Sequence, residues 1–299
     1  MTVESRAERP LVSVILPTHN RVDLLAVAVE SVLSQTERGF ELIVVDDGSR
    51  DATPEYLAAL TSRDRRARSI RLEIPRGGGG ARNEGLRLSR GDWVAFLDDD
   101  DRWLPSKLET QLAAVRAHPA AVAASCGYER VFPSRKRQVV AVPPAVKLRD
   151  LFEFNVLGSA SLCFASAQAL RAIEGFDTSL VAGQNLDLWV RLRQLGEIVV
   201  CSEPLVLYYV HDGPRITNNM LSQYAGSRRF YFKHRHLMDR AVRRHRIAHA
   251  SFLMSRQLER RLYRRIRFLL IAMRNAKLRD AIAYARSSLP RLLRDAAAR

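Results

Sequence analysis

The sequence predicts an α/β fold, with a mostly parallel twisted sheet flanked by helices and a basic helical extension at the C-terminus. Over residues 11–120, short apolar runs alternate with amphipathic helical segments at the spacing of βαβ units. Residues 228–299 instead carry 21 Lys and Arg against four Asp and Glu, a net charge of +17 in a chain whose total is +16. This change in composition is the clearest domain boundary in the sequence.

The first half contains four predicted strands, each followed by a predicted helix. The strands are apolar runs that end at a proline, a glycine or an acidic turn, as buried strands do. Helix starts are indicated by Asp23, by Asp51 as an N-cap residue and by Pro105 as a first-turn proline. The predicted strands are 11–16, 40–46, 69–74 and 93–98, and the predicted helices begin at Asp23, Asp51, Ala81 and Pro105.

After residue 120 the pattern is looser, and after residue 220 it is almost entirely helical. Predicted strands are 121–128, 137–143, 159–165 and 205–211, with a helix over 185–194. An apolar stripe set among arginines comprises Leu258, Leu262, Ile266, Leu269, Leu270 and Met273. We therefore expect one domain over 1–220, with a first half at 11–120 and a second at 121–220, and a basic helical extension over 221–299.

Composition points to a cytoplasmic protein. The N-terminus has no apolar region of a secretory signal, and no segment approaches the ~20 apolar residues of a membrane span. Cys126, Cys163 and Cys201 lie far apart in apolar stretches, which favours reduced core residues over metal ligands or disulfides. The glycine-rich 77–80 segment matches neither GxGxxG nor the P-loop pattern, so both of those nucleotide sites are excluded.

Polar or glycine-rich segments follow each of the four predicted strands. They contain Thr18 and His19, Asp46 and Asp47, the glycines 77–80, and the run Asp98 to Asp101. Because ligands of parallel α/β sheets bind beyond the carboxyl ends of the strands, these segments are expected to converge on one ligand site.

The motifs resemble those of the family 2 glycosyltransferases. The resemblance rests on VSVILPTHNRVDLL, SVLSQTERGFELIVVDDGSRD, ARNEGL and GDWVAFLDDDDRWLPSKLE, in this order over residues 11–120. A weaker match continues through NVLGSAS, EGFDTSL, LDLWVRL and YVHDGPRIT. The resemblance implies a GT-A fold, which is Rossmann-like, and an enzyme that uses a nucleotide-diphosphate sugar.

The resemblance also implies roles for individual residues. Thr18, His19 and Asp47 would face the nucleotide base and ribose, and Arg82 would lie near the nucleotide. Asp98-Asp99-Asp100 matches the DXD motif. Asp100 would be the direct ligand of Mg²⁺ or Mn²⁺, Asp98 or Asp99 would hold ribose or metal-bound water, and Asp101 would orient the following turn. His211 would lie near the metal or the diphosphate, although a structural role is an open alternative.

The implied reaction is an inverting transfer to an acceptor hydroxyl, in the synthesis of an envelope or cell-surface glycan. Such a metal offsets the negative charge that develops on the leaving diphosphate. The acceptor, a glycan or a lipid-linked sugar, needs a general base to remove its proton.

The sequence departs from the family at that base. Gln184 and Asn185 stand where the family has an acidic pair, and an amide cannot act as a general base. Three explanations stay open: Asp187 takes the role, the acceptor is already anionic, or the chain binds nucleotide sugars with weak or no transfer.

The basic tail has several possible partners. Arg-rich amphipathic helices suit an anionic membrane surface, so we expect peripheral association of residues 228–299 with the inner face of the membrane. The alternatives are a solvated helical appendage and an oligomer contact. Nucleic acid is disfavoured, because no known recognition motif is present.

Overall fold

The computed structural model describes residues 10–211, 219–257, 262–277 and 280–283. The chain divides into two compact units, each of which is described by itself. The first comprises Met1–Lys147, Val156–Asp177 and Leu188–His211, and the second comprises Leu148–Asn155, Thr178–Asp187 and Asp212–Arg299. The predicted boundary at residue 220 stays a prediction.

The first unit is built around one sheet that contains all the described strands. Their order is β3-β2-β1-β4-β8-β6-β9-β5, and β7 pairs with β6. The strands are β1 (Val12–Thr18), β2 (Phe40–Asp46), β3 (Ala67–Arg71), β4 (Trp93–Phe96), β5 (Asp101–Trp103), β6 (Ala121–Val131), β7 (Arg137–Val140), β8 (Phe164–Ser166) and β9 (Glu197–Tyr209).

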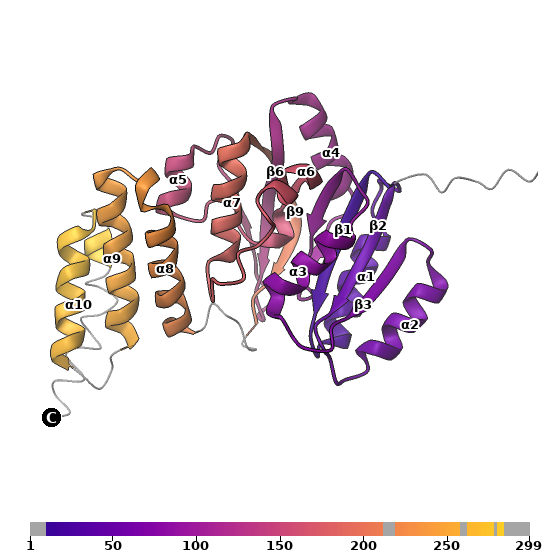
Figure 1. The fold of residues 1–299 in the computed structure, drawn as a ribbon, viewed down its shortest axis with the longest axis horizontal. Coiled ribbons are helices and arrows are strands. Elements are labelled where there is room, and N and C mark those ends of the chain that lie inside the picture. The colour runs from indigo at the N-terminus through magenta and orange to yellow at the C-terminus, as the bar shows by residue number, and fades with distance from the viewer. Residues whose placement is uncertain (1–9, 212–218, 258–261, 278–279, 284–299) are drawn as a thin grey trace, which may run out of the picture. The chain divides into compact units, whose positions relative to one another are not determined.

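The half formed by β3, β2, β1 and β4 is parallel, as predicted. Its central strands β1 and β2 are buried along their whole length, which explains their apolar sequences. The connecting helices are α1 (Val22–Leu33), α2 (Thr53–Arg63) and α3 (Gly77–Leu88), visible in Figure 1. In α3, a Cβ on Gly85 would lie 2.4 Å from Ile15 Cγ2, so this glycine allows the helix to pack directly on β1.

Several predicted boundaries in this half are wrong: β3, predicted at 69–74, is Ala67–Arg71, and two other differences lie next to the acidic run or the glycine segment. The glycines 77–80 form the first turn of α3, although the sequence places the helix start at Ala81. Gly77 has φ of 69°, a conformation that glycine adopts without strain, and the helix continues from it. The fourth strand ends at Phe96, which leaves the whole acidic run outside it.

The other half of the sheet is mixed. Strand β8 is antiparallel to both β4 and β6, while β6 and β9 are parallel. The short β5 pairs antiparallel with β9, with Asp101 opposite Tyr208. The acidic run therefore connects β4 to β5, which is the last strand in the order of the sheet. The helices of this half are α4 (Lys107–Ala117), α6 (Ala167–Ala172) and the larger part of α7 (Gln184–Leu195).

Cys126, Cys163 and Cys201 are buried and free, as predicted. The predicted strand 159–165 is instead a short 3-10 turn over Ala160–Leu162 followed by β8. The predicted strand 205–211 is the last part of β9, which begins at Glu197.

The second unit is helical. It contains α5 (Leu148–Glu153), the first turn of α7, α8 (Met220–His234), α9 (Arg240–Gln257) and α10 (Leu262–Asn275). Phe152 and Phe230 are buried with ring centroids 6.5 Å apart, and Ala248 packs with Leu269 and Ala272 of α10. None of the described helices combines the length and the apolar character that crossing a bilayer requires. Leu258 of the predicted apolar stripe lies outside the described residues.

A buried carboxylate joins the N-terminal ends of three strands in the first unit. Glu41 is 2% exposed and accepts hydrogen bonds from Ser13 Oγ at 2.7 Å and from the backbone N–H of Arg90 at 2.8 Å. Arg68 and Arg90 form ion pairs with it at 3.0 and 2.9 Å. Burial raises the pKa of Glu41, but the hydrogen bonds from Ser13, Arg90 and Arg68 outweigh burial and lower it below its usual 4.5.

We expect Glu41→Gln to lower the free energy of unfolding at neutral pH by about 1–3 kcal/mol, because buried donors lose their anionic acceptor. Since the folded-state pKa is lowered, this stabilisation is present above about pH 4.5 and is lost as the pH falls through the folded value. The difference between wild type and variant should therefore shrink in acid. Urea unfolding at pH 7 and pH 4 measures this difference in free energy of unfolding, with Glu73→Gln, at an exposed residue, as the control. A difference that is constant with pH would contradict the assignment.

Candidate functional site

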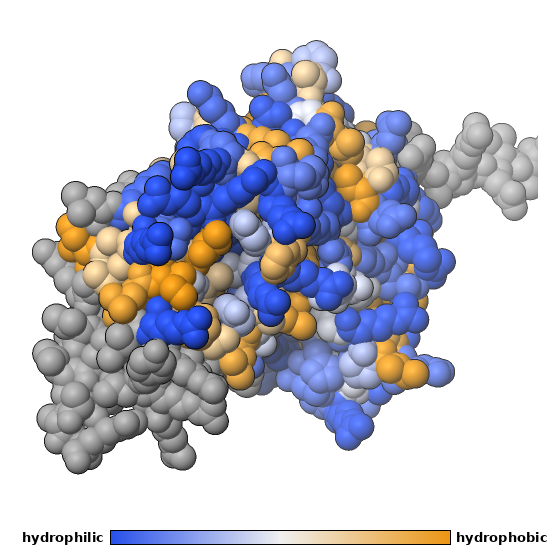
Figure 2. Space-filling view, turned by 60° about the vertical axis from the view of Figure 1, so that its left-hand side comes forward, coloured by the Kyte–Doolittle hydropathy of each residue, from blue (hydrophilic) through white to orange (hydrophobic). Residues whose placement is uncertain are grey.

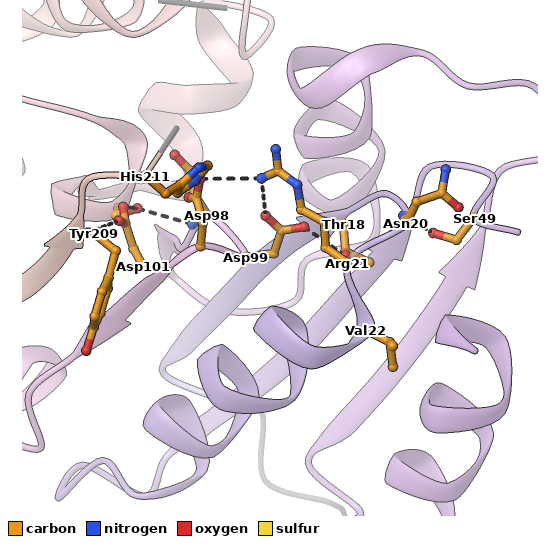
Figure 3. Close-up of polar contacts among 12 residues, drawn as sticks. Thr18, Asn20, Arg21, Val22, Ser49, Asp98, Asp99, Asp101, Tyr209 and His211 are labelled. Atoms are coloured by element: carbon orange, nitrogen blue, oxygen red, sulfur yellow. Dashed lines mark hydrogen bonds and ion pairs between the residues drawn. The ribbon is translucent and has the colours of Figure 1, made fainter. Parts of the chain in front are cut away.

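The carboxyl end of β1 lies against the acidic run, as the sequence predicts. Thr18 is 3% exposed, and its Oγ1 donates a hydrogen bond of 2.9 Å to Asp99 Oδ2. Arg21 Nη1 contacts Asp99 Oδ1 at 3.1 Å and Asp100 Oδ2 at 3.3 Å. In Figure 3 the guanidinium group of Arg21 points from the start of α1 toward Asp99. Two segments that are about 80 residues apart in the chain therefore form one polar cluster.

A second arginine reaches the acidic run from α3. Arg82 Nη2 forms an ion pair with Asp98 Oδ1, and its guanidinium lies over the Phe176 ring, 5.2 Å from the centroid. Asn83 exchanges two hydrogen bonds with the backbone of Phe176, at 2.8 and 2.7 Å. A Cβ on Gly78 would lie 3.1 Å from Arg82 Nη1, so this glycine leaves room for the guanidinium.

The end of β9 brings a histidine to the same cluster. His211 Nε2 lies 2.9 Å from Asp100 Oδ2. Because Asp101 pairs with Tyr208 in an antiparallel ladder, residues after Tyr208 run back alongside the residues before Asp101. The pairing of β5 with β9 thus places His211 beside the acidic run.

Asp101 is the most deeply buried carboxylate of the run. It is 1% exposed, and it accepts hydrogen bonds from Ser161 Oγ at 2.6 Å and from the backbone N–H of Tyr209 at 3.4 Å. The Ser161 hydroxyl also accepts the N–H of Asp98 at 3.1 Å. These contacts hold the run in place between β4 and β5.

Burial dominates the electrostatics of the inner carboxylates. It raises the pKa of Asp99 to about 6, against the opposing effects of Arg21 and Thr18. Burial also raises the pKa of Asp101 well above its usual range, and the charges of Asp98 and Asp100 raise it further. One carboxylate oxygen each from Asp98, Asp100 and Asp101 lie within 4.8 Å of one another, a spacing at which a metal ion can be held.

The predicted nucleotide residues Asp47 and His19 lie in the neighbouring loops. Both oxygens of Asp47 accept backbone N–H groups, from Arg76 at 2.6 Å and from Gly77 at 2.8 Å, so Asp47 caps the start of α3. His19 Nδ1 lies 2.8 Å from the carbonyl oxygen of Asp47. Asp46, which is buried, accepts the N–H of Ser49 at 2.8 Å and stabilises the turn after β2.

Asp187, the predicted base, lies in the second unit and is fully buried. Its Oδ1 contacts Lys233 Nζ and His234 Nε2, both at 2.8 Å. These contacts connect the first turn of α7 to α8. Gln184 donates a hydrogen bond to the carbonyl of Leu180 at 2.8 Å. In this structure Asp187 anchors two helices, and its role as base stays a prediction.

Sequence reasoning missed Arg21, Asn83 and Ser161 as residues of this cluster. Each lies inside one of the segments that resemble the family motifs, and that resemblance is the one sequence signal that points to these residues. Their partners lie 60 to 93 positions away in the chain, and periodicity carries no information about such contacts.

Comparison with known proteins agrees with this geometry. The model of the family described as "Glycosyl transferase family 2" matches residues 13–166. The putative colanic acid biosynthesis glycosyl transferase WcaA of Escherichia coli K12 is 29% identical over 277 residues, which cover 90% of this chain and 95% of that protein. The E. coli UDP-Glc:α-D-GlcNAc-diphosphoundecaprenol β-1,3-glucosyltransferase WfgD is 40% identical over 103 residues, 34% of this chain and 40% of that one.

Solved structures show the same fold. Staphylococcus aureus TarS 1–349 in complex with UDP-GlcNAc has a TM-score of 0.63 at 19% identity, covering 95% of this chain and 79% of that one. The mannosyltransferase PcManGT of Pyrobaculum calidifontis, in complex with GDP-Man and Mn²⁺, has a TM-score of 0.59 at 20% identity, covering 96% and 81%. The GT-A fold is thereby confirmed. The family model spans half of the chain and includes β1, α3 and the acidic run, and the protein therefore belongs to the family 2 glycosyltransferases.

Proposed function

We propose that this glycosyltransferase is a metal-dependent, inverting enzyme. It transfers a sugar from a nucleotide-diphosphate donor to an acceptor hydroxyl in the synthesis of an envelope glycan. The observation that carries the proposal is the acidic run at the end of β4, where Arg21, Arg82 and His211 converge on Asp98 to Asp100. An anionic cluster bordered by two arginines can hold both a cation and a phosphate group.

The donor set fits Mg²⁺ or Mn²⁺. Both ions take carboxylate oxygens, and three such oxygens lie within 4.8 Å here. Asp101 is held inward by Ser161 and Tyr209, so Asp98 and Asp100 are the proposed ligands, with His211 beside them. When bound, the ion would supply positive charge to the leaving diphosphate as a Lewis acid.

The chain's own residues bind and orient the donor. Thr18, His19, Asp47 and Arg82 are the proposed nucleotide-sugar contacts, together with Asp98 and Asp99. Arg82, which lies between Phe176 and Asp98, is positioned to pair with a phosphate. The complexes of TarS with UDP-GlcNAc and of PcManGT with GDP-Man support a nucleotide-sugar donor.

The names of the relatives support the proposed acceptor class. WcaA is named for colanic acid biosynthesis, and WfgD for a sugar on diphosphoundecaprenol. We propose a glycan or lipid-linked acceptor for this chain, in a reaction at the inner face of the membrane.

Helix α10 supports a membrane contact. Leu270 and Met273 of α10 are 59% and 37% exposed, whereas Leu269 and Ala272 are buried, and exposed arginines lie near the two exposed residues in the helix. Figure 2 shows hydrophobic surface directly beside strongly hydrophilic surface on one face of the molecule. Together with the net charge of +17 over 228–299, this favours an anionic lipid surface over the alternative of a solvated appendage.

Asp100→Asn is expected to abolish the Mn²⁺-dependent part of UDP binding, because it removes the central carboxylate of the cluster. Calorimetry of UDP with and without Mn²⁺ measures this, and the exposed Asp23→Asn on α1 controls for the lost charge. Intact Mn²⁺-dependent binding in Asp100→Asn would refute the metal assignment.

Transfer assays with UDP-, GDP- and dTDP-sugars test the transferase activity itself. Binding without turnover would favour a nucleotide-sugar-binding protein that transfers weakly or not at all.

Asp187→Asn is expected to lower the free energy of unfolding by about 1–3 kcal/mol, because Lys233 and His234 lose a buried anionic partner. Urea unfolding measures this, and the double variant Asp187→Asn/Lys233→Gln should regain part of the loss. A variant with wild-type stability and strongly reduced turnover would instead identify Asp187 as the general base.

Leu270→Glu/Met273→Glu in the full chain is expected to reduce co-sedimentation with anionic vesicles, because it removes apolar surface and adds negative charge. Leu24→Glu, at an exposed leucine of α1, is the matched control. Equal pelleting of both variants and wild type with phosphatidylglycerol-containing vesicles would argue against the α10 contact.

A further inference from the structure

We propose that Arg21 is a positioning residue that occupies the acidic cluster until a nucleoside diphosphate binds, and thereby makes metal binding depend on the donor. The inference rests on the proposed function, because it takes Asp100 as a metal ligand. It adds a role for a residue to which neither the motif pattern nor the fold assigns one.

The contacts of Arg21 place a positive charge on the carboxylates that a metal would use. Its Nη1 lies 3.3 Å from Asp100 Oδ2, the same oxygen that lies 2.9 Å from His211 Nε2. It also lies 3.1 Å from Asp99 Oδ1. The Arg21 side chain is 30% exposed, whereas those of Asp99 and Asp100 are 9% and 15% exposed. The arginine thus closes the cluster from the solvent side.

The loop that carries Arg21 is fixed in place, so the contact is built into the fold. Asn20 has φ of 53°, its N–H donates to Ser49 Oγ at 2.9 Å, and its Oδ1 accepts the N–H of Arg50 at 2.6 Å. The N–H of Val22 donates to Asp51 Oδ2 at 3.1 Å. Figure 3 shows Asn20 beside Ser49 and Arg21 turned toward the acidic run. Residues on both sides of Arg21 are therefore tied to the loop between β2 and α2.

A cation on Asp100 and the guanidinium of Arg21 repel each other. Both are attracted to the Asp100 carboxylate, and charges interact most strongly in the partly buried cluster, where solvent screens least. Arg82 already pairs with Asp98, and Asp101 is held inward by Ser161. A divalent ion that arrives alone must displace Arg21 from Asp100, so its affinity is low.

A diphosphate removes this competition. Two oxygens of a phosphate can accept hydrogen bonds from both arms of the planar guanidinium, so Arg21 gains a new anionic partner and releases Asp100. The metal then meets the Asp100 carboxylate without the competing guanidinium, together with the phosphate oxygens. By thermodynamic linkage, the donor raises the affinity for the metal by the same factor as the metal raises the affinity for the donor.

The test compares Arg21→Gln with wild type, with Arg21→Lys and with Arg102→Gln as controls. Arg102 carries the same charge two positions from Asp100, but its guanidinium lies over the Tyr209 ring, 4.7 Å from the centroid. Mn²⁺ binding is measured by electron paramagnetic resonance without nucleotide and with saturating UDP. UDP binding is measured by calorimetry with and without Mn²⁺.

We expect Arg21→Gln to bind Mn²⁺ alone about tenfold or more tightly than wild type, because the competing charge is gone. The gain in Mn²⁺ affinity that UDP produces should shrink correspondingly. In Mn²⁺ affinity without nucleotide, Arg21→Lys, which keeps the charge, and Arg102→Gln should both resemble wild type. If thermal unfolding shows that Arg21→Gln is not folded, Arg21→Met, which keeps the length of the side chain, provides the same comparison.

Two outcomes overturn the inference and are distinguishable from each other. If UDP promotes Mn²⁺ binding in wild type but Arg21→Gln binds Mn²⁺ alone no more tightly, Arg21 does not control the metal, and the proposed function stands. If no variant binds Mn²⁺ even with bound UDP, the metal assignment fails and the inference fails with it.

Discussion

The constraint on which this site depends is the repulsion among four consecutive carboxylates in the connection from β4 to β5. Like charges at this spacing destabilise the fold unless each is partnered. The structure supplies at least one partner for each position: Arg82 for Asp98, Thr18 and Arg21 for Asp99, Arg21 and His211 for Asp100, and Ser161 with the Tyr209 N–H for Asp101. These partners come from the end of β1, from α3, from the segment before β8 and from the end of β9. Neutralising the run therefore draws together the loops that are proposed to form the nucleotide site.

The partners also divide the run into an exchangeable part and a fixed part. Asp101 is held by a hydroxyl and a backbone N–H, groups that belong to the fold and cannot leave without breaking it. The side chains of Asp98 and Asp100 are 23% and 15% exposed, and their partners are the side chains of Arg82, Arg21 and His211. In the proposed function these are the two carboxylates at which a cation would exchange, while the backbone of Asp101 stays paired with β9. The proposal thus assigns two of the four acids to the metal and Asp101 to the fold.

Much of this architecture follows from the sequence, because strand burial and the alternation of strands and helices are local properties. The buried strands β1 and β2 and the acidic run at a strand end were predicted in this way.

Three features were not predictable, and each depends on a contact distant in the chain. Strand β5 is three residues long and forms only through its pairing with β9. Asp47 caps a helix that begins 30 positions later, and that contact also moves the start of α3 back to the glycines. Asp187 contacts Lys233 and His234 of α8, 46 and 47 positions away, where no helical or strand periodicity relates them.

The charge of the C-terminal segment is not explained by pairing within the chain. Residues 228–299 contain 21 cations and four anions, so 17 cations exceed the acidic partners even if every anion there is paired. Subtracting these from the totals of 48 basic and 32 acidic residues leaves 27 cations and 28 anions in the rest of the chain. Acidic and basic residues are therefore nearly equal in number there. Contacts such as Lys277 with Glu153 and Lys233 with Asp187 use only a few of the excess charges. A positive excess of this size destabilises a compact segment through self-repulsion. An external anionic surface would relieve that repulsion at each basic residue near it, and the exposed apolar side chains of α10 are the feature that favours the proposed lipid surface over a purely ionic partner.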